Sequence, residues 1–151
     1  MARGRMITNE IARDKKINEL SCDTSRLAFT WLITFADVEG RTYGDPVLVK
    51  NMLFPRRDDI TTEQMIAYIS EWAEAGLIIW YETRGDKWIL FPNFRRHQPN
   101  LRVDREPASI IPEPKHDAGD MTADCRILAG VMPEHIPVKL REENGIKREE
   151  K

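Results

Sequence analysis

The chain has 151 residues, of which 41% are hydrophobic and 32% are charged, a composition that supports one folded domain with a strongly ionic surface. It contains no run of apolar residues long enough for a membrane span and no apolar signal segment, so we expect a cytoplasmic protein that does not enter a membrane. The two cysteines lie far apart in the sequence, which argues against a disulfide framework. The net charge of −2 argues against a globally basic nucleic-acid binder.

The chain divides into two parts of different composition. Residues 1–98 hold all four tryptophans and most of the large apolar side chains, whereas residues 99–151 hold six of the nine prolines and no aromatic residue. A segment this poor in large apolar groups does not readily offset the conformational entropy that it loses on ordering. We therefore expect a folded domain at 1–98, followed by an extended and largely irregular tail at 99–151.

One stretch of this tail has the pattern of a helix. Asp120 can cap a turn that begins at Met121, and apolar residues then recur at helical spacing until Pro133 ends the pattern. The pattern predicts a short helix at 120–132. Two interpretations remain open, a transient helix in a disordered tail and a helix that docks on a partner.

The first clear helix of the folded part begins near Asp23, whose carboxylate can accept hydrogen bonds from the amides of the opening turn. A broad apolar face follows, and the helix ends by Gly40. A weaker helical pattern precedes it at 10–19. These two segments form the predicted N-terminal part of the domain.

A short strand and a second helix come next. Residues 41–43 have a strand-like composition. Asp45 and Pro46 then supply a capping carboxylate and a proline at the first helical position, where the missing amide costs nothing. Pro55 ends this second helix.

The third helix and a hairpin complete the domain. Thr61 and Gln64 form a capping box, and Gly76 closes the helix in the left-handed conformation. Residues 77–83 and 87–91 are rich in β-branched and aromatic side chains, and a tight glycine turn separates them. We therefore predict a β-hairpin directly after the third helix.

The predicted order is helix, short strand, helix, helix and hairpin. This is the order of a winged helix-turn-helix domain, in which three helices form the core and the hairpin forms a wing. Other small α+β folds share the same order. The sequence therefore predicts an α+β fold, with the winged helix-turn-helix as the first interpretation.

Five short motifs are Asp37-Val38-Glu39-Gly40-Arg41, Gly44-Asp45-Pro46, Phe54-Pro55-Arg56-Arg57-Asp58-Asp59-Ile60, Ala75-Gly76-Leu77-Ile78 and Phe91-Pro92-Asn93-Phe94-Arg95-Arg96-His97-Gln98. In combination, they resemble the N-terminal winged-helix domain of DnaD-like primosome proteins and phage replisome organisers. The resemblance covers roughly residues 1–98. It implies DNA binding, self-association into a homo-oligomer and a role in replication initiation, with a replicative helicase or its loader as a partner.

The charge of the third helix does not suit the role of a groove reader. In helix-turn-helix proteins this helix normally enters the major groove. From Asp58 to Thr83, however, the chain has six acidic residues and no lysine or arginine, so that DNA phosphates would repel this face. We expect the helix to face solvent or a protein partner, with Tyr68 and Glu71 as candidate interface residues.

The basic residues gather outside the third helix, before it, around the hairpin and near the N-terminus. We predict that they contact phosphates and read few bases. The alternative is that they are ordinary solvated charges paired with local acids. The candidate DNA-binding residues are Arg3, Arg5, Lys15, Lys16, Arg56, Arg57, Arg84, Lys87, Arg95 and Arg96.

No catalytic constellation is evident. The sequence lacks a phosphate-binding glycine loop and any local signature of a serine or cysteine nucleophile, and its three histidines have no metal-ligand spacing. Residues 84–86 match an adhesion tripeptide, but a glycine turn at a hairpin tip is the commoner cause. We expect a non-enzymatic protein with no metal and no cofactor.

Two rival functions stay open beside a DNA-binding replication protein. A transcriptional regulator of the same fold would need a third helix that reads bases, and an adaptor would bind no nucleic acid. Two readings also stay open for Trp80 and Trp88, which lie on facing strands. They are either core residues or an exposed stacking platform for single-stranded nucleic acid.

Overall fold

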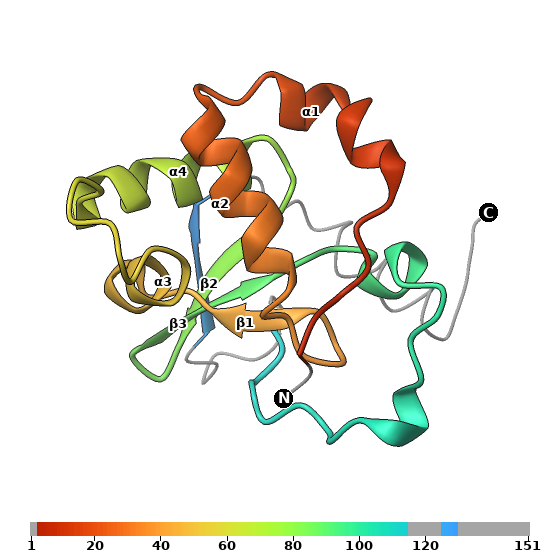
Figure 1. Cartoon of the computed structure of the whole chain (residues 1–151). Coiled ribbons are helices and arrows are strands. Elements are labelled where there is room, and N and C mark those ends of the chain that lie inside the picture. The colour runs from red at the N-terminus through yellow and green to blue at the C-terminus, as the bar shows by residue number, and fades with distance from the viewer. Residues whose placement is uncertain (1–2, 115–124, 130–151) are drawn as a thin grey trace.

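The structure is a computed structural model that describes residues 3–114 and 125–129 (Figure 1). Its elements are, in chain order, the 3-10 helix η1 (Asn9–Ala12), α1 (Lys15–Asn18), α2 (Asp23–Ile33), β1 (Arg41–Tyr43), α3 (Pro46–Leu53), α4 (Thr62–Glu74), β2 (Ile79–Thr83), β3 (Asp86–Leu90), the 3-10 helices η2 (Phe94–His97) and η3 (Val103–Arg105), and β4 (Cys125–Ala129). The predicted α+β class is confirmed. Among the described residues, no helix has the length and apolar character needed to cross a membrane.

The strands form one antiparallel sheet in the order β1-β3-β2-β4. Leu90 of β3 lies between Arg41 of β1 and Ile79 of β2, so the hairpin forms the centre of the sheet. Tyr81 of β2 lies opposite Ile127 of β4. The short strand at 41–43 and the hairpin are therefore as the sequence predicted, and a fourth strand is added at the edge of β2.

The helix starts follow from local chemistry. The Thr61 hydroxyl accepts from the Gln64 amide and the Gln64 side chain accepts from the Thr61 amide, which confirms the predicted capping box. The Asp45 side chain accepts from Val47 at 2.9 Å, as predicted for the second helix. The cap of α2 differs from prediction, because Cys22 occupies the cap position without a side-chain hydrogen bond and Asp23 is the first helical residue.

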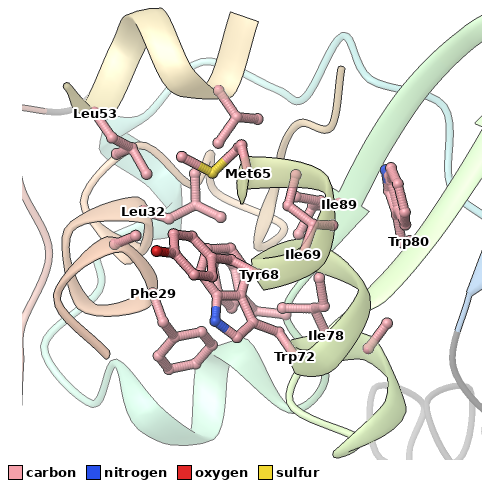
Figure 2. Packing of buried hydrophobic residues seen from close by; sticks show 14 of the residues in the cluster. Phe29, Leu32, Leu53, Met65, Tyr68, Ile69, Trp72, Ile78, Trp80 and Ile89 are labelled. Carbon is pink, nitrogen blue, oxygen red and sulfur yellow. The ribbon is translucent and has the colours of Figure 1, made fainter. Parts of the chain in front are cut away.

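One face of the sheet packs on the helices and forms the main core. Figure 2 shows Phe29 of α2 beside Trp72 of α4, with Ile89 of the sheet on the same cluster. The Phe29 and Trp72 rings meet edge to face with centroids 5.7 Å apart. The Trp72 indole donates to the Ser25 hydroxyl at 2.9 Å, so that α2 and α4 share a hydrogen bond inside the core.

The opposite face of the sheet carries a second, smaller cluster, which is made of Ile79, Tyr81, Leu90, Trp88 and Ile127. Residues 109–113 run beside this face. The Tyr81 hydroxyl donates to the Pro112 carbonyl at 2.7 Å, and the Arg41 guanidinium donates to the Ile111 carbonyl at 2.8 Å. Both faces of the sheet are therefore used for packing.

Residues beyond the predicted boundary at residue 98 contact the domain. Gln98 is buried and exchanges two hydrogen bonds with the backbone of Met6, each at 2.9 Å, while Arg5 binds Glu106. These polar anchors, together with the buried Ile111 and with Leu101 on the main core, hold residues 99–114 on the domain. The compositional argument missed the polar anchors because it counts apolar area only.

The short helix predicted at 120–132 is wrong where the structure describes it, because residues 125–129 form strand β4. Ile127 packs on the second cluster and Leu128 on the main core, as expected for successive strand residues that point to opposite faces. Pairing with the open edge of β2 outweighs a weak helical periodicity. Residues 120–124 and 130–132 of that prediction lie outside the described residues.

Candidate nucleic-acid interface

The exposed face of α4 carries acidic residues, as the sequence indicated. Glu63 and Glu74 are exposed near the two ends of the helix, and Gln64 and Ala67 are exposed between them. No lysine or arginine belongs to this helix. DNA phosphates would meet a negative surface here, so α4 is poorly suited to enter a groove.

The two candidate interface residues of α4 are occupied inside the molecule. Tyr68 is only 9% exposed, and Cys22 donates to its hydroxyl across 3.7 Å. Burial raises the pKa of Tyr68. Glu71 accepts from the Ser21 amide at 3.1 Å and from the Ser25 hydroxyl. These contacts join α4 to the start of α2, so the predicted partner role of Tyr68 and Glu71 is replaced by an internal one.

Arg5 is also internal, contrary to its predicted DNA contact. Its side chain is 4% exposed and forms two bonds with Glu106, at 2.6 and 2.7 Å. It donates to the Ala36 carbonyl at 3.1 Å and lies over the Phe94 ring at 5.5 Å from the centroid. The guanidinium is therefore fully used within the fold. The hydrogen bonds from Arg5 in turn lower the pKa of Glu106.

The hairpin turn presents two of the predicted cations. Arg84 is exposed and has a positive φ of 55°, and Gly85 beside it has a φ of 84°. Arg84 forms no ion pair with any other residue of the described ranges. Lys87 is partly exposed and lies opposite Glu82 in the strand register. The tip of the hairpin therefore offers a free guanidinium to a ligand.

The loop between α3 and α4 presents two more of the predicted DNA-binding cations, Arg56 and Arg57. Arg56 is exposed, whereas Arg57 binds Asp59 through two hydrogen bonds at 2.9 and 2.8 Å. The hydrogen bond from Arg57 lowers the pKa of Asp59 to about 2. The Arg57 guanidinium also lies 5.8 Å from the centroid of the Phe54 ring. Arg56 is thus the freer cation of this pair.

The remaining candidates lie on other parts of the surface. Arg95 and Arg96 are exposed on η2, where Arg95 pairs with Glu39 at 3.0 Å. Lys15 and Lys16 are exposed on α1, and Arg3 is exposed at the start of the described chain.

The structure does not gather these cations into one strip. In Figure 1 the β2–β3 turn and the α3–α4 loop lie on the left, η2 lies on the right and α1 lies at the top. The N-terminal arm runs beside η2 and away from the hairpin tip, because Met6 is tied to Gln98. The basic residues of the hairpin and of the N-terminus are therefore separate sites.

The two tryptophans of the hairpin do not share a platform. Trp80 is 7% exposed and its indole donates to the Gly44 carbonyl at 2.8 Å, which makes it a core residue. Trp88 belongs to the second cluster on the other face of the sheet, with its ring 5.9 Å from that of Tyr43.

Sequence reasoning missed the exposure of Trp31, which lies on the apolar face of α2. Trp31 is 44% exposed, and Leu27, one turn earlier, is 36% exposed. Positions 27 and 31 share one side of the helix, while Ala28 and Leu32 occupy the buried side. All four residues are apolar, so the sequence carries no signal that separates the two sides.

Comparison of the chain with protein-family models, with curated proteins and with solved structures finds no match. Within the described part of the chain, no group of histidine, cysteine and acidic side chains is arranged to hold a metal ion.

Proposed function

We propose that this protein is a DNA-binding protein with a winged helix-turn-helix domain that acts in replication initiation and self-associates. In this assignment α2, α3 and α4 are the three core helices, and β2 and β3 form the wing. The order of the elements and the β1-β3-β2 pairing of the sheet support the winged-helix interpretation. The role in replication rests on the resemblance of the five motifs to phage replisome organisers.

One observation carries the proposed mode of binding, namely the contrast between the wing and α4. Arg84 is exposed and unpaired among the described residues at the wing tip, whereas the exposed face of α4 is acidic. Such a distribution favours contact with phosphates through the wing and disfavours the reading of bases by a helix in the major groove. We therefore propose binding with little sequence preference and with a strong dependence on salt.

The salt dependence of DNA binding tests this proposal. Each phosphate contact contributes about 0.9 to the slope of log K against log salt for duplex DNA. The double variant R84A/K87A should lower this slope by about 1 to 2. The variant R102A/R105A is the matched control, since it removes the same number of exposed cations at η3, and neither residue is a candidate DNA contact.

An unchanged slope in R84A/K87A would remove the wing from the mechanism. Tight binding of one particular sequence would favour a transcriptional regulator. The absence of any DNA binding by the unaltered protein would favour an adaptor.

A further inference from the structure

We propose that Trp31, Arg56 and Arg57 form a stacking site for a base and phosphate of single-stranded DNA. We call this group, with Phe54 beneath it and Leu27 beside it, the Trp31 site. The inference rests on the proposed DNA binding and names the form of the nucleic acid that is bound. It adds a second contact surface to the wing.

The first step is the exposure of Trp31. Trp72 is fully buried and Trp80 is 7% exposed, but Trp31 leaves 44% of its surface open to solvent. A contiguous apolar surface that is open to solvent marks an interaction site, whereas a single exposed side chain does not. Leu27 extends the open apolar surface by one helical turn.

The second step is that Phe54 brings an indole and a guanidinium to one surface. The Trp31 ring centroid lies 5.7 Å from that of Phe54, and the Arg57 guanidinium carbon lies 5.8 Å from it. Phe54 is buried and contacts both of these neighbours. Asp59 holds the guanidinium of Arg57 through two hydrogen bonds. The exposed indole and the held guanidinium are therefore joined through one buried ring.

The third step is the charge around the site. Asp59 neutralises Arg57, but Arg56 is exposed and has no ion pair with any other described residue. Arg56 is thus the group available to a phosphate, while Arg57 supplies a planar cation on the same phenylalanine ring that the indole contacts. A cation next to an exposed aromatic ring is the combination that binds single strands without sequence preference.

A single strand fits this site better than a duplex does. In a duplex the faces of the bases are stacked on one another, so an indole on a helix surface cannot reach them unless a base is flipped out. In a single strand the base is free to stack on the indole while its phosphate contacts a cation. Trp31 therefore contributes to the binding of single strands, whereas the wing binds duplex DNA.

The test compares a short oligothymidine strand with a duplex of the same length, using the full chain and fluorescence anisotropy. The variant W31A should bind the single strand about ten-fold more weakly. W31F should retain part of the affinity because it keeps an aromatic ring. L48A is the matched control, since Leu48 is 48% exposed on α3 and is not part of the Trp31 site. A thermal melt of each variant verifies that it is folded.

Intrinsic tryptophan fluorescence gives a second readout. The single strand should quench the unaltered protein, and the part of the quenching due to Trp31 should be lost in W31F. The proposal is overturned if W31A matches the unaltered protein in affinity for the single strand and in quenching, while R84A/K87A still changes the salt slope for the duplex. It is also overturned if W31A alters only the oligomeric mass, which would make the surface a protein contact. Failure of the unaltered protein to bind any DNA would overturn the proposed function as well.

Discussion

The Arg5 guanidinium and the Glu106 carboxylate form a two-bonded ion pair, at 2.6 and 2.7 Å, between residues 101 positions apart. The pair fixes the N-terminal arm to a segment that composition alone would leave free. Because Arg5 is 4% exposed, its charge has little contact with water and depends on this partner.

Replacement of Glu106 should therefore destabilise the domain. E106Q leaves the buried guanidinium without a counter-charge, and we expect a loss of about 2–3 kcal/mol in the free energy of unfolding. E113Q is the matched control, because Glu113 is 63% exposed and lies 3.6 Å from Arg41. Urea unfolding of both variants measures the difference. Equal stability of E106Q and E113Q would contradict the assigned role of the pair.

The contribution of Glu106 should depend on pH. Its pKa is lowered from the usual 4.5 by hydrogen bonds from Arg5. A carboxylate whose pKa is lower in the folded state stabilises that state above the unfolded pKa and loses this effect as the pH falls through the folded pKa. The stability difference between the unaltered protein and E106Q should thus be largest at neutral pH and shrink below pH 4.5. A difference that is constant with pH would show that the charge is not the cause.

The end point of the folded part can be tested by truncation. A chain of residues 1–98 loses Glu106 and the carbonyl of Pro112, so that Arg5 and the Tyr81 hydroxyl lose their partners. We expect it to be less stable than a chain of residues 1–114 by roughly 3–5 kcal/mol. Thermal unfolding of the two chains compares them directly, and equal midpoints would support the boundary at residue 98.

The hydrogen bond between Trp72 and Ser25 offers a test of the core. S25A removes the acceptor of the buried indole N–H and also the hydroxyl that donates to Glu71, and we expect a combined loss of about 1–3 kcal/mol. T30A serves as a control on the same helix, because the Thr30 hydroxyl only donates back to the Arg26 carbonyl at 2.8 Å. Denaturant unfolding gives both values. A loss in T30A as large as that in S25A would point to the helix and not to the indole bond.

Gly44 is required by the close approach of two strands. A β-carbon at this position would lie 2.6 to 2.8 Å from backbone atoms of Trp88, which cannot move without breaking the sheet. We expect G44A to cost about 1–3 kcal/mol through overpacking. At Gly4 a β-carbon would meet no atom within 4 Å, so G4A should have nearly no effect. A thermal shift assay that finds the two variants equal would contradict this explanation.

The sequence allowed the helices and the hairpin to be predicted where local chemistry decides them. The Thr61–Gln64 capping box and the Asp45 cap are interactions among neighbours, and both were found as predicted. Strand β4 was not foreseen, because its identity depends on the edge of β2, which is distant in the sequence. Local pattern cannot reveal which edge a segment will meet.

The candidate site was predictable in residue type but not in position. Arg5 and Arg84 are both arginines that the sequence offers equally as DNA contacts. In the structure, Arg5 is enclosed by Glu106 and Phe94, whereas Arg84 is exposed at the hairpin turn. The exposure of Trp31 was likewise decided by which side of α2 faces the sheet and α4. Only the packed fold distinguishes a cation used for stability from one that can meet a ligand.

The tie between the two ends of the domain also sets an order on biosynthesis. Met6 and Arg5 find their partners at Gln98 and Glu106, which are among the last described residues to leave the ribosome. The central helices and the hairpin can assemble on the nascent chain before then, but the Met6–Gln98 and Arg5–Glu106 hydrogen bonds cannot form until translation has passed residues 98 and 106. The N-terminal arm is thus translated before the helices but fully anchored after them.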